Sequence, residues 1–166
     1  MPYQESELFP YDVTDLSSFD ALVVAPHPDD EAIGCGGVIA HHVRAGRRVK
    51  VLFLTDGGQG DLQGRYGGDY RILRQQSARE ALGILGVTEY EFWNYGDRSL
   101  YQERFEVQVR LYDAISAFSP TIIYGPSGFE LHPDHRTVFE MLWEAKERNG
   151  LPLALYECLV PLVPTS

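Results

Sequence analysis

The sequence of 166 residues fits one domain of ordinary size, and its 24 acidic and 14 basic side chains give a formal net charge of −10. This acidic balance argues against nucleic acid or an anionic membrane as the main partner, because both bind cationic surfaces. No apolar run approaches the ~20 residues that cross a bilayer, no signal peptide is visible, and two cysteines cannot form a disulfide framework. We therefore expect a cytoplasmic protein, whose oligomeric state the sequence leaves open.

Strand and helix patterns alternate along the chain after a polar lead-in over residues 1–19. Short apolar runs predict buried parallel strands, and apolar residues at helical spacing predict the helices between them. In chain order we expect a strand at 21–25, a helix that ends near Gly46, a strand at 49–54, a helix at 70–85, a strand at 90–93, a helix at 102–118, a strand at 121–124, a helix at 135–148 and a strand at 153–156. This alternation predicts a single α/β domain over 20–166, with a Rossmann-like, mostly parallel sheet and helices on both faces.

Two glycine-rich stretches interrupt these patterns. Residues 56–69 contain six glycines and follow the second expected strand. Long loops of this kind are either functional or plain flexible connections, so a mobile lid and a simple connection are equally good interpretations. Gly34, Gly36 and Gly37 resemble an anion-binding helix start, although the full dinucleotide-binding fingerprint is missing.

Histidines and carboxylates gather where two of the expected strands end. The first strand runs into segment 26–31, Pro-His-Pro-Asp-Asp-Glu, and the fourth runs into segment 131–135, Leu-His-Pro-Asp-His. Ligands of a parallel sheet bind beyond the carboxyl ends of its strands, and two imidazoles with a carboxylate are a common ligand set for a divalent transition metal. One His-Pro-Asp segment alone would favour simple turn and cap chemistry. Two copies at one sheet edge favour a metal site.

The sequence indicates a function less strongly for the other polar residues. His41 and His42 lie in the first expected helix, away from this edge, which favours surface or packing roles. Cys35 lies near a helix start, where a thiol pKa can be lowered, but a buried small residue is the commoner explanation. Asp97 follows the third strand and could line a substrate pocket, with strand-end packing as the alternative.

The two motifs resemble those of the LmbE-like/PIG-L family of zinc-dependent N-acetylglucosamine deacetylases. The resemblance extends over most of the chain from Asp20 to about Glu157. Its matching positions are 25–31, Gly34 with 36–37, 54–57, Arg74, Ala81, 85–86 and 132–135. It implies a hydrolase that removes acetate from an N-acetylated amino sugar, a small-molecule N-acetylglucosamine conjugate.

The same resemblance implies a metal centre and a base. His27, Asp30 and His135 would bind Zn²⁺, although Fe²⁺ or another divalent ion also suits two histidines and one aspartate. Asp29 would be the general base, which accepts the proton of the attacking water.

Further roles follow for four polar residues. His132 would stabilise the oxyanion or act as an acid, and its acidic surroundings favour the charged form. Asp134 would orient His132 or a neighbouring ligand. Arg74 matches the arginine that contacts the sugar in the family, and Asp97 is a second candidate for substrate binding. One departure lies close to Arg74, since Ser77 occupies a position where the family often has an acid.

Two more departures and two alternatives remain. Glu130 and Leu131 precede the second motif, where many members have a glycine or a polar residue, and the chain looks short beside the family at its C-terminus. The same ligands would serve a hydrolase of another amide or an ester. A non-catalytic sugar- or nucleotide-binding module of the same fold is the second alternative. An intact Asp29 argues against that module, because a binding protein needs no base beside a metal site.

Overall fold

The computed structural model describes residues 14–61, 64–66 and 69–158. Most of the expected lead-in therefore lies outside the described residues, as do the last eight residues and four positions of the glycine-rich loop, 62–63 and 67–68. Its described part begins with a short 3-10 helix, η1 (Leu16–Ser18).

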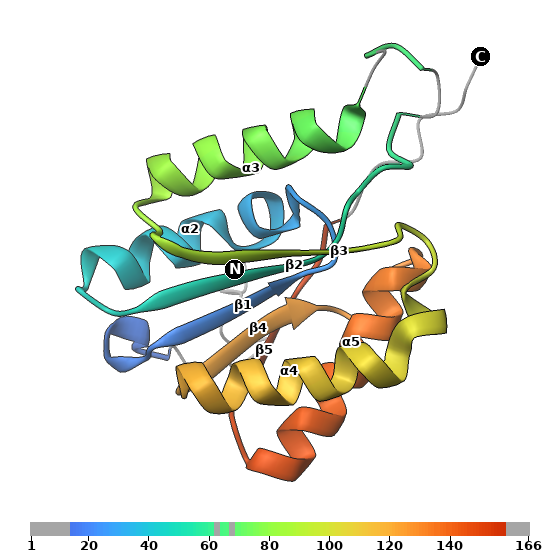
Figure 1. Ribbon diagram of the computed structural model, residues 1–166. Helices are drawn as coiled ribbons and strands as arrows, with labels where there is room; N and C mark the ends of the chain where they lie inside the picture. The colour runs from blue at the N-terminus through green and yellow to red at the C-terminus, as the bar shows by residue number, and fades with distance from the viewer. Residues whose placement is uncertain (1–13, 62–63, 67–68, 159–166) are drawn as a thin grey trace, which may run out of the picture.

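One parallel sheet of five strands forms the centre of the protein (Figure 1). Its strands are β1 (Ala21–Ala25), β2 (Val49–Thr55), β3 (Glu89–Tyr95), β4 (Ile122–Pro126) and β5 (Leu153–Tyr156), and each lies within a few residues of its expected position. The spatial order is β3-β2-β1-β4-β5, with every neighbouring pair parallel. The chain thus leaves β1 in one direction and returns to its other side at β4, which makes the β1–β4 boundary the topological switch point where ligands bind in such sheets.

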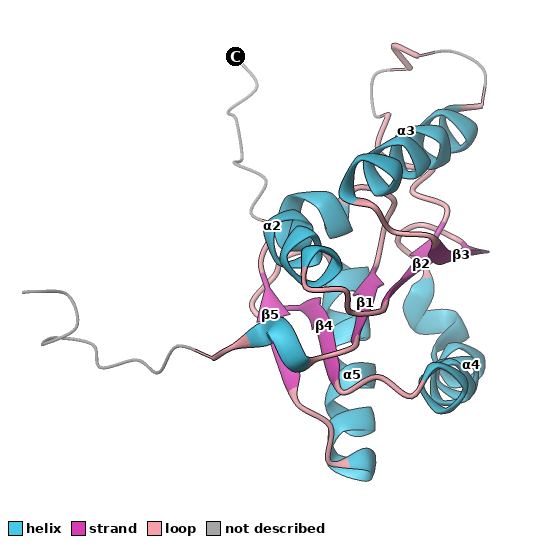
Figure 2. Cartoon of the chain, turned by 90° about the vertical axis from the view of Figure 1, so that its left-hand side faces the viewer, coloured by secondary structure: helices cyan, strands magenta, loops and turns pink. Residues whose placement is uncertain are grey.

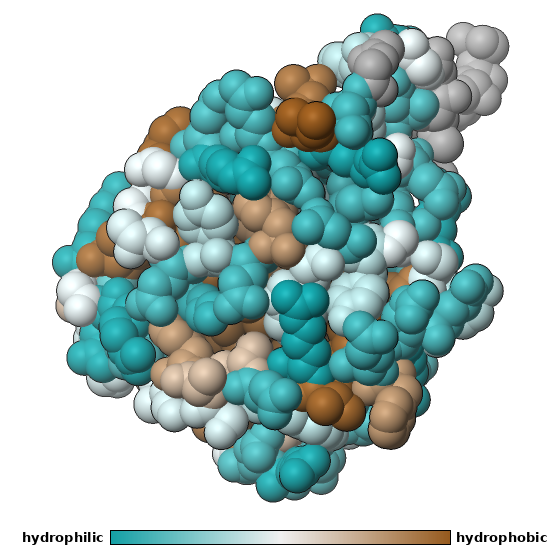
Figure 3. All heavy atoms as spheres, in the orientation of Figure 1, coloured by the Kyte–Doolittle hydropathy of each residue, from teal (hydrophilic) through white to brown (hydrophobic). Residues whose placement is uncertain are grey.

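Helices cover both faces of the sheet (Figure 2). They are α2 (Asp30–Arg44), α3 (Tyr70–Leu85), the short η2 (Leu100–Glu103), α4 (Arg104–Phe118) and α5 (Pro133–Asn149). Alternate residues of β1 point to opposite faces: Val23 packs in the core under α2 and α3, whereas Val24 packs in the core under α4 and α5. Burial on both faces explains why the β1 sequence is continuously apolar. Hydrophilic residues dominate the outer face shown in Figure 3.

The three glycines of the first helix do not form a helix start. They lie inside α2, whose N-cap is Asp29, so the interpretation as an anion-binding turn is wrong. Gly34 instead allows β5 to approach, because a Cβ atom at this position would lie 2.3 Å from the ring of Tyr156. Gly36 meets no such obstacle.

Cys35 is one of the buried residues of α2. Burial raises the pKa of its thiol to about 12, so the packing interpretation is correct and a reactive thiolate is excluded.

The histidine pair of α2 has packing and surface roles, as the helix position predicts. His41 is exposed, whereas His42 is fully buried with its Nε2 2.9 Å from the Tyr124 hydroxyl oxygen. Burial lowers the pKa of His42 below its ordinary value of 6.5. The folded protein therefore resists protonation of this ring, while the unfolded chain does not.

This difference predicts a pH dependence of stability. As the pH falls below about 6.5, protonation of the unfolded chain should lower the free energy of unfolding, and the contribution of His42 is fully present only above that pH. Urea unfolding at several pH values checks this, with His42→Gln expected to lose stability less steeply than wild type on acidification. His41→Gln is the matched control and should keep the wild-type slope; equal slopes for all three proteins would contradict the prediction.

Candidate metal centre

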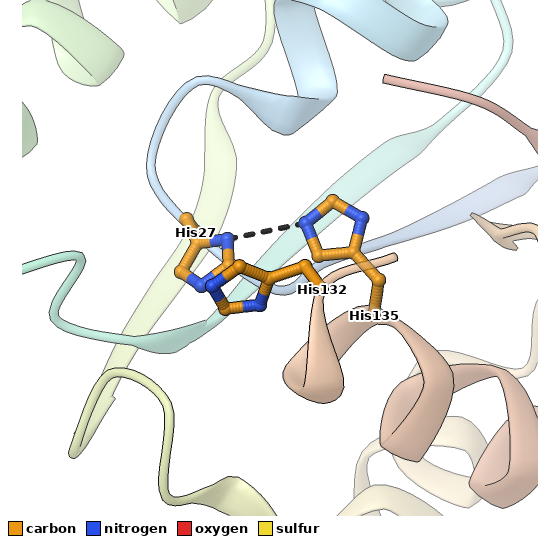
Figure 4. A group of neighbouring side chains, drawn as sticks. All are labelled: His27, His132 and His135. Carbon is orange, nitrogen blue, oxygen red and sulfur yellow. Dashed lines mark hydrogen bonds between the residues drawn. The ribbon is translucent and has the colours of Figure 1, made fainter. Parts of the chain in front are cut away.

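The loops after β1 and β4 bring the two motifs together. Because β1 and β4 are parallel neighbours, their carboxyl ends meet at the switch point of the sheet. His27 comes from the β1 loop, while His132 is the N-cap of α5 and His135 lies in its first turn. Figure 4 shows the three imidazoles turned toward one another. The prediction that both motifs share one edge is thus confirmed by the fold.

Three buried side chains form a compact triangle of donor atoms. Nδ1 of His27 lies 3.1 Å from Oδ2 of Asp30, and Nε2 of His135 lies 3.2 Å from each of these two atoms. Ligands at the ordinary zinc distance of about 2.0–2.1 Å, in a tetrahedron, are about 3.3 Å apart. The donor set therefore fits a tetrahedral ion with one position left open, and its members are the three ligands that the resemblance implies.

Asp30 has an electrostatic environment that suits a ligand. Burial opposes ionisation, but the hydrogen bonds and charges of His135 and His27 outweigh it and hold the pKa of Asp30 well below its usual range. The carboxylate is therefore ionised and ready to accept a cation.

The second ring nitrogen of His27, Nε2, contacts two carboxylates. Its Nε2 lies 3.3 Å from Oδ2 of Asp134 and 3.3 Å from Oδ1 of Asp97. Asp134 is fixed in turn, since the backbone N–H groups of Arg98 and Leu100 donate to its two oxygens at 2.7 and 3.1 Å. A carboxylate that accepts from one ring nitrogen leaves the other free to ligate, which is the usual outer support of a metal-binding histidine.

Asp134 therefore faces the ligand His27 more closely than it faces His132. The donor atoms of His27, His132 and His135 also lie within 4.8 Å of one another, as do those of His27, Asp97, His132 and Asp134, so these are two further groups of metal-binding type. Backbone N–H groups already engage both carboxylate oxygens of Asp134, and its orienting role stays a prediction.

His132 is a neutral hydrogen-bonding group in this structure. Its Nδ1 accepts the backbone N–H of Asp134 at 3.3 Å, so its proton resides on Nε2. Burial, together with the nearby His27, lowers the pKa of His132 to about 4, although Asp134 acts in the opposite direction. The expectation of a histidine cation was wrong here because desolvation of the ring outweighs the acidic surroundings.

Asp29 adopts an unusual backbone conformation at the start of α2. Its φ is 149°, and although it is the N-cap of α2 its side chain makes no capping hydrogen bond. The reciprocal contact of a capped helix is present, because Oε2 of Glu31 accepts the Asp29 backbone N–H at 3.0 Å. Positive φ at a non-glycine residue is strained and occurs often at functional sites. The Asp29 carboxylate is half exposed and ion-paired with Arg74.

A cavity of about 390 Å³ opens beside Asp29, between the start of α2 and α3. Glu31, Tyr70 and Leu73 are part of its lining. Burial raises the pKa of Asp29, despite the Arg74 charge that lowers it. Sequence reasoning missed Glu31, although an acid just inside a helix start, able to reach back to the N-cap, is a recognisable signal.

Arg74 joins the loops around Asp29. Its guanidinium donates to the carbonyl oxygen of Pro28 at 3.0 and 3.2 Å and to that of Gly57 at 3.3 Å, in addition to the Asp29 ion pair. In this structure its donors thus serve the protein, and its contact with a sugar stays a prediction.

Asp97 is buried beside His27 and does not line the cavity next to Asp29. It accepts the backbone N–H of Gln59 at 2.9 Å through Oδ2, and the hydrogen bond and charge of His27 outweigh burial to lower the pKa of Asp97 to about 2. The Gln59 side chain also donates to the Asp97 backbone carbonyl at 2.8 Å. These contacts fix the first part of the glycine-rich loop to the site. Positions 62–63 and 67–68 of this loop lie outside the described residues. Its role as a lid stays a prediction.

The chain is similar to known proteins over most of its length. Residues 22–146 match the family described as PIG-L, GlcNAc-PI de-N-acetylase. Diacetylchitobiose deacetylase of Thermococcus kodakarensis is 36% identical over 135 residues, which cover 79% of this chain and 50% of that protein. A 1D-myo-inositol 2-acetamido-2-deoxy-alpha-D-glucopyranoside deacetylase of Mycobacterium sp. (strain KMS) is 32% identical over 157 residues, with 76% and 50% coverage. The chain thus spans about half the length of these curated relatives.

The fold has equally clear counterparts among solved structures. N,N'-diacetylchitobiose deacetylase from Pyrococcus horikoshii, in complex with its inhibitor MPG, superimposes with a TM-score of 0.75 at 27% identity. The match covers 91% of this chain and 66% of that structure.

Among the described residues, no helix is both long and apolar enough to cross a membrane.

Proposed function

This chain belongs to the PIG-L family, and from that membership we propose that it is a metal-dependent hydrolase that removes acetate from an N-acetylated amino sugar. The observation that carries the proposal is the buried triangle of His27, Asp30 and His135 with the half-exposed Asp29 beside it in the chain. Relatives named as deacetylases of diacetylchitobiose and of an acetamido-glucopyranoside support a small N-acetylglucosamine conjugate as the substrate.

We propose that Zn²⁺ is the ion held by His27, Asp30 and His135. Two nitrogens and one carboxylate oxygen at tetrahedral spacing suit zinc, and Fe²⁺ can use the same donors. When bound, such an ion polarises the acetamide carbonyl and activates water for attack.

Asp29 is the general base in this proposal. Its carboxylate is half exposed and is held in place by Arg74 and by the Glu31 contact to its backbone. It would accept the proton of the attacking water and deliver it to the departing amine nitrogen, which is otherwise a poor leaving group.

His132 stabilises the developing negative charge as a hydrogen-bond donor. With Nδ1 occupied by the Asp134 backbone, its Nε2–H is free to donate to the carbonyl oxygen as that oxygen becomes negative. Asp134 holds His27 on its outer side. Arg74 would contact the sugar at the rim of the cavity, and Asp97 would support substrate binding from below.

We also propose a single domain and a cytoplasmic location. The apolar cores on both faces of one sheet support a single domain over 20–166. Cys35 and Cys158 are both buried free thiols, which supports a reducing, cytoplasmic environment.

Removal of the metal tests the proposed chemistry. Dialysis against a chelator should abolish acetate release from N,N'-diacetylchitobiose, and about one equivalent of Zn²⁺ should restore it, because the bound ion would supply the activation of water and carbonyl. Acetate and free amine are measured together. Activity that ignores both treatments would contradict the proposal. In a panel of amides and esters, faster cleavage of a compound without an acetamido sugar would overturn the substrate class.

A further inference from the structure

His135 has one ring nitrogen in the ligand triangle and the other in a buried position behind it. Nε2 faces Asp30 and His27 at 3.2 Å, whereas Nδ1 is buried and has no hydrogen-bond partner among the described residues. A neutral imidazole that offers Nε2 to an ion carries its proton on Nδ1. A buried N–H left without an acceptor costs about 1–3 kcal/mol. A hydrogen-bond acceptor is therefore expected next to Nδ1 of His135 when Nε2 is the ligand atom.

Glu130 supplies a carboxylate at that place. Its Oε1 lies 3.7 Å from Nδ1 of His135, and its side chain is as deeply buried as the ring, at 6% exposure each. The backbone N–H of Cys158, just after β5, donates to the same oxygen. Cys158 also reaches the backbone of Asp30, with Sγ 3.6 Å from its carbonyl oxygen. The carboxylate is thus fixed by the chain after β5, slightly beyond hydrogen-bond distance of the ring.

The same arrangement exists at the other ligand histidine. Nδ1 of His27 belongs to the triangle, and its Nε2 faces the Asp134 carboxylate at 3.3 Å. A histidine ligand is usually supported in this way, since an outer carboxylate fixes both the tautomer and the ring orientation. Glu130 would complete the pair.

We propose that Glu130 is a positioning residue of the metal centre, which accepts the Nδ1–H of His135 and so makes Nε2 the ligand atom. The inference rests on the proposed function, because it assumes an ion in the triangle of His27, Asp30 and His135. Loss of an outer partner of this kind weakens metal binding by about 10–100-fold. We expect a loss of that size when the carboxylate is removed.

Zinc affinity of the chelator-treated protein tests this. Competition with a fluorescent chelator gives the Zn²⁺ dissociation constant of wild type, Glu130→Gln and Glu130→Ala. Glutamine keeps an oxygen for the Cys158 N–H but loses the charge, so we expect weaker binding by at least about tenfold for Glu130→Gln and up to about 100-fold for Glu130→Ala. Glu140→Gln is the matched control, because it removes the same charge from an exposed position of α5 and should bind like wild type. Thermal unfolding of the metal-free proteins confirms that each variant is folded.

A measurement on the wild-type protein makes the test independent of variant folding. In the zinc-loaded protein, NMR of the histidine rings should show His135 protonated on Nδ1, with a slowly exchanging downfield proton. A His135 ring that carries its proton on Nε2 overturns the proposal. Folded Glu130 variants whose Zn²⁺ dissociation constant lies within about threefold of the wild-type value would also overturn it, provided that wild type binds one ion. Wild-type protein that binds no zinc would overturn the proposed metal centre as well, which separates the two failures.

Discussion

Replacing Asp29 by asparagine is expected to lower kcat for acetate release by about 10²–10⁴-fold, while the protein still binds one zinc ion. Asparagine keeps the size of the side chain, but it cannot accept the proton of the attacking water. Glu31 contacts the Asp29 backbone and not its side chain, so the strained turn should persist in the variant. Steady-state kinetics with N,N'-diacetylchitobiose and metal analysis of the same sample provide the two measurements.

The adjacent acid provides a matched control. Asp30→Asn should lose zinc, because Oδ2 of Asp30 lies 3.1–3.2 Å from both histidine donors and completes the triangle. Its activity should return only at high zinc concentration, whereas added zinc should leave Asp29→Asn inactive. If Asp29→Asn lost the metal and Asp30→Asn kept it, the roles of the two aspartates would be exchanged.

Replacing Gly34 by alanine is expected to lower the free energy of unfolding by about 3 kcal/mol, the upper part of the range for overpacked cores. The new Cβ would lie 2.3–2.9 Å from three ring atoms of Tyr156. This ring cannot move freely, because its hydroxyl donates to the Val24 carbonyl oxygen at 2.9 Å and it is buried against α2. Urea unfolding of the variant measures the loss.

Gly36→Ala is the control for the helix itself. No atom lies within 4 Å of its Cβ position, and α2 continues through it. Because alanine is the better helix former, the free energy of unfolding should rise by about 0.5–1 kcal/mol. Equal destabilisation by both substitutions would show that glycine flexibility, and not the contact with Tyr156, decides the effect at position 34.

Local sequence patterns were sufficient to predict the elements of the fold. The apolar runs predicted the three central strands, β1, β2 and β4, since a strand buried on both faces has no polar alternation. Helix boundaries were less accurate: α2 begins at Asp30 and contains the glycines that were interpreted as a turn. Its N-cap, Asp29, has a positive φ that no propensity predicts, and its backbone N–H donates to Glu31.

At the site, the residue types were predictable from the sequence, whereas the protonation states were not. The two His-Pro-Asp segments indicated a metal site because ligand residue types are local information, and the carboxyl-edge rule placed both at one edge. Protonation states were not predictable, since the pKa of His132 depends on how deeply its ring is desolvated. Glu130 was visible as a departure from the family pattern, but its place behind His135 required the packing of β5 against the loop before α5.

By itself, the sequence determined the α/β architecture and indicated, through its resemblance to the family, which residues would hold a metal, because hydrophobic periodicity and residue types in short segments are local information. Only the tertiary structure decided which atoms face one another. It brought the ligand atoms of His27, Asp30 and His135 to 3.1–3.2 Å and placed Asp134 and Glu130 on the outer sides of the two histidines. The contacts of His27 with His135 and with Asp134 join residues about a hundred positions apart in the chain. Their distances depend on how the sheet and helices pack, which no local pattern specifies.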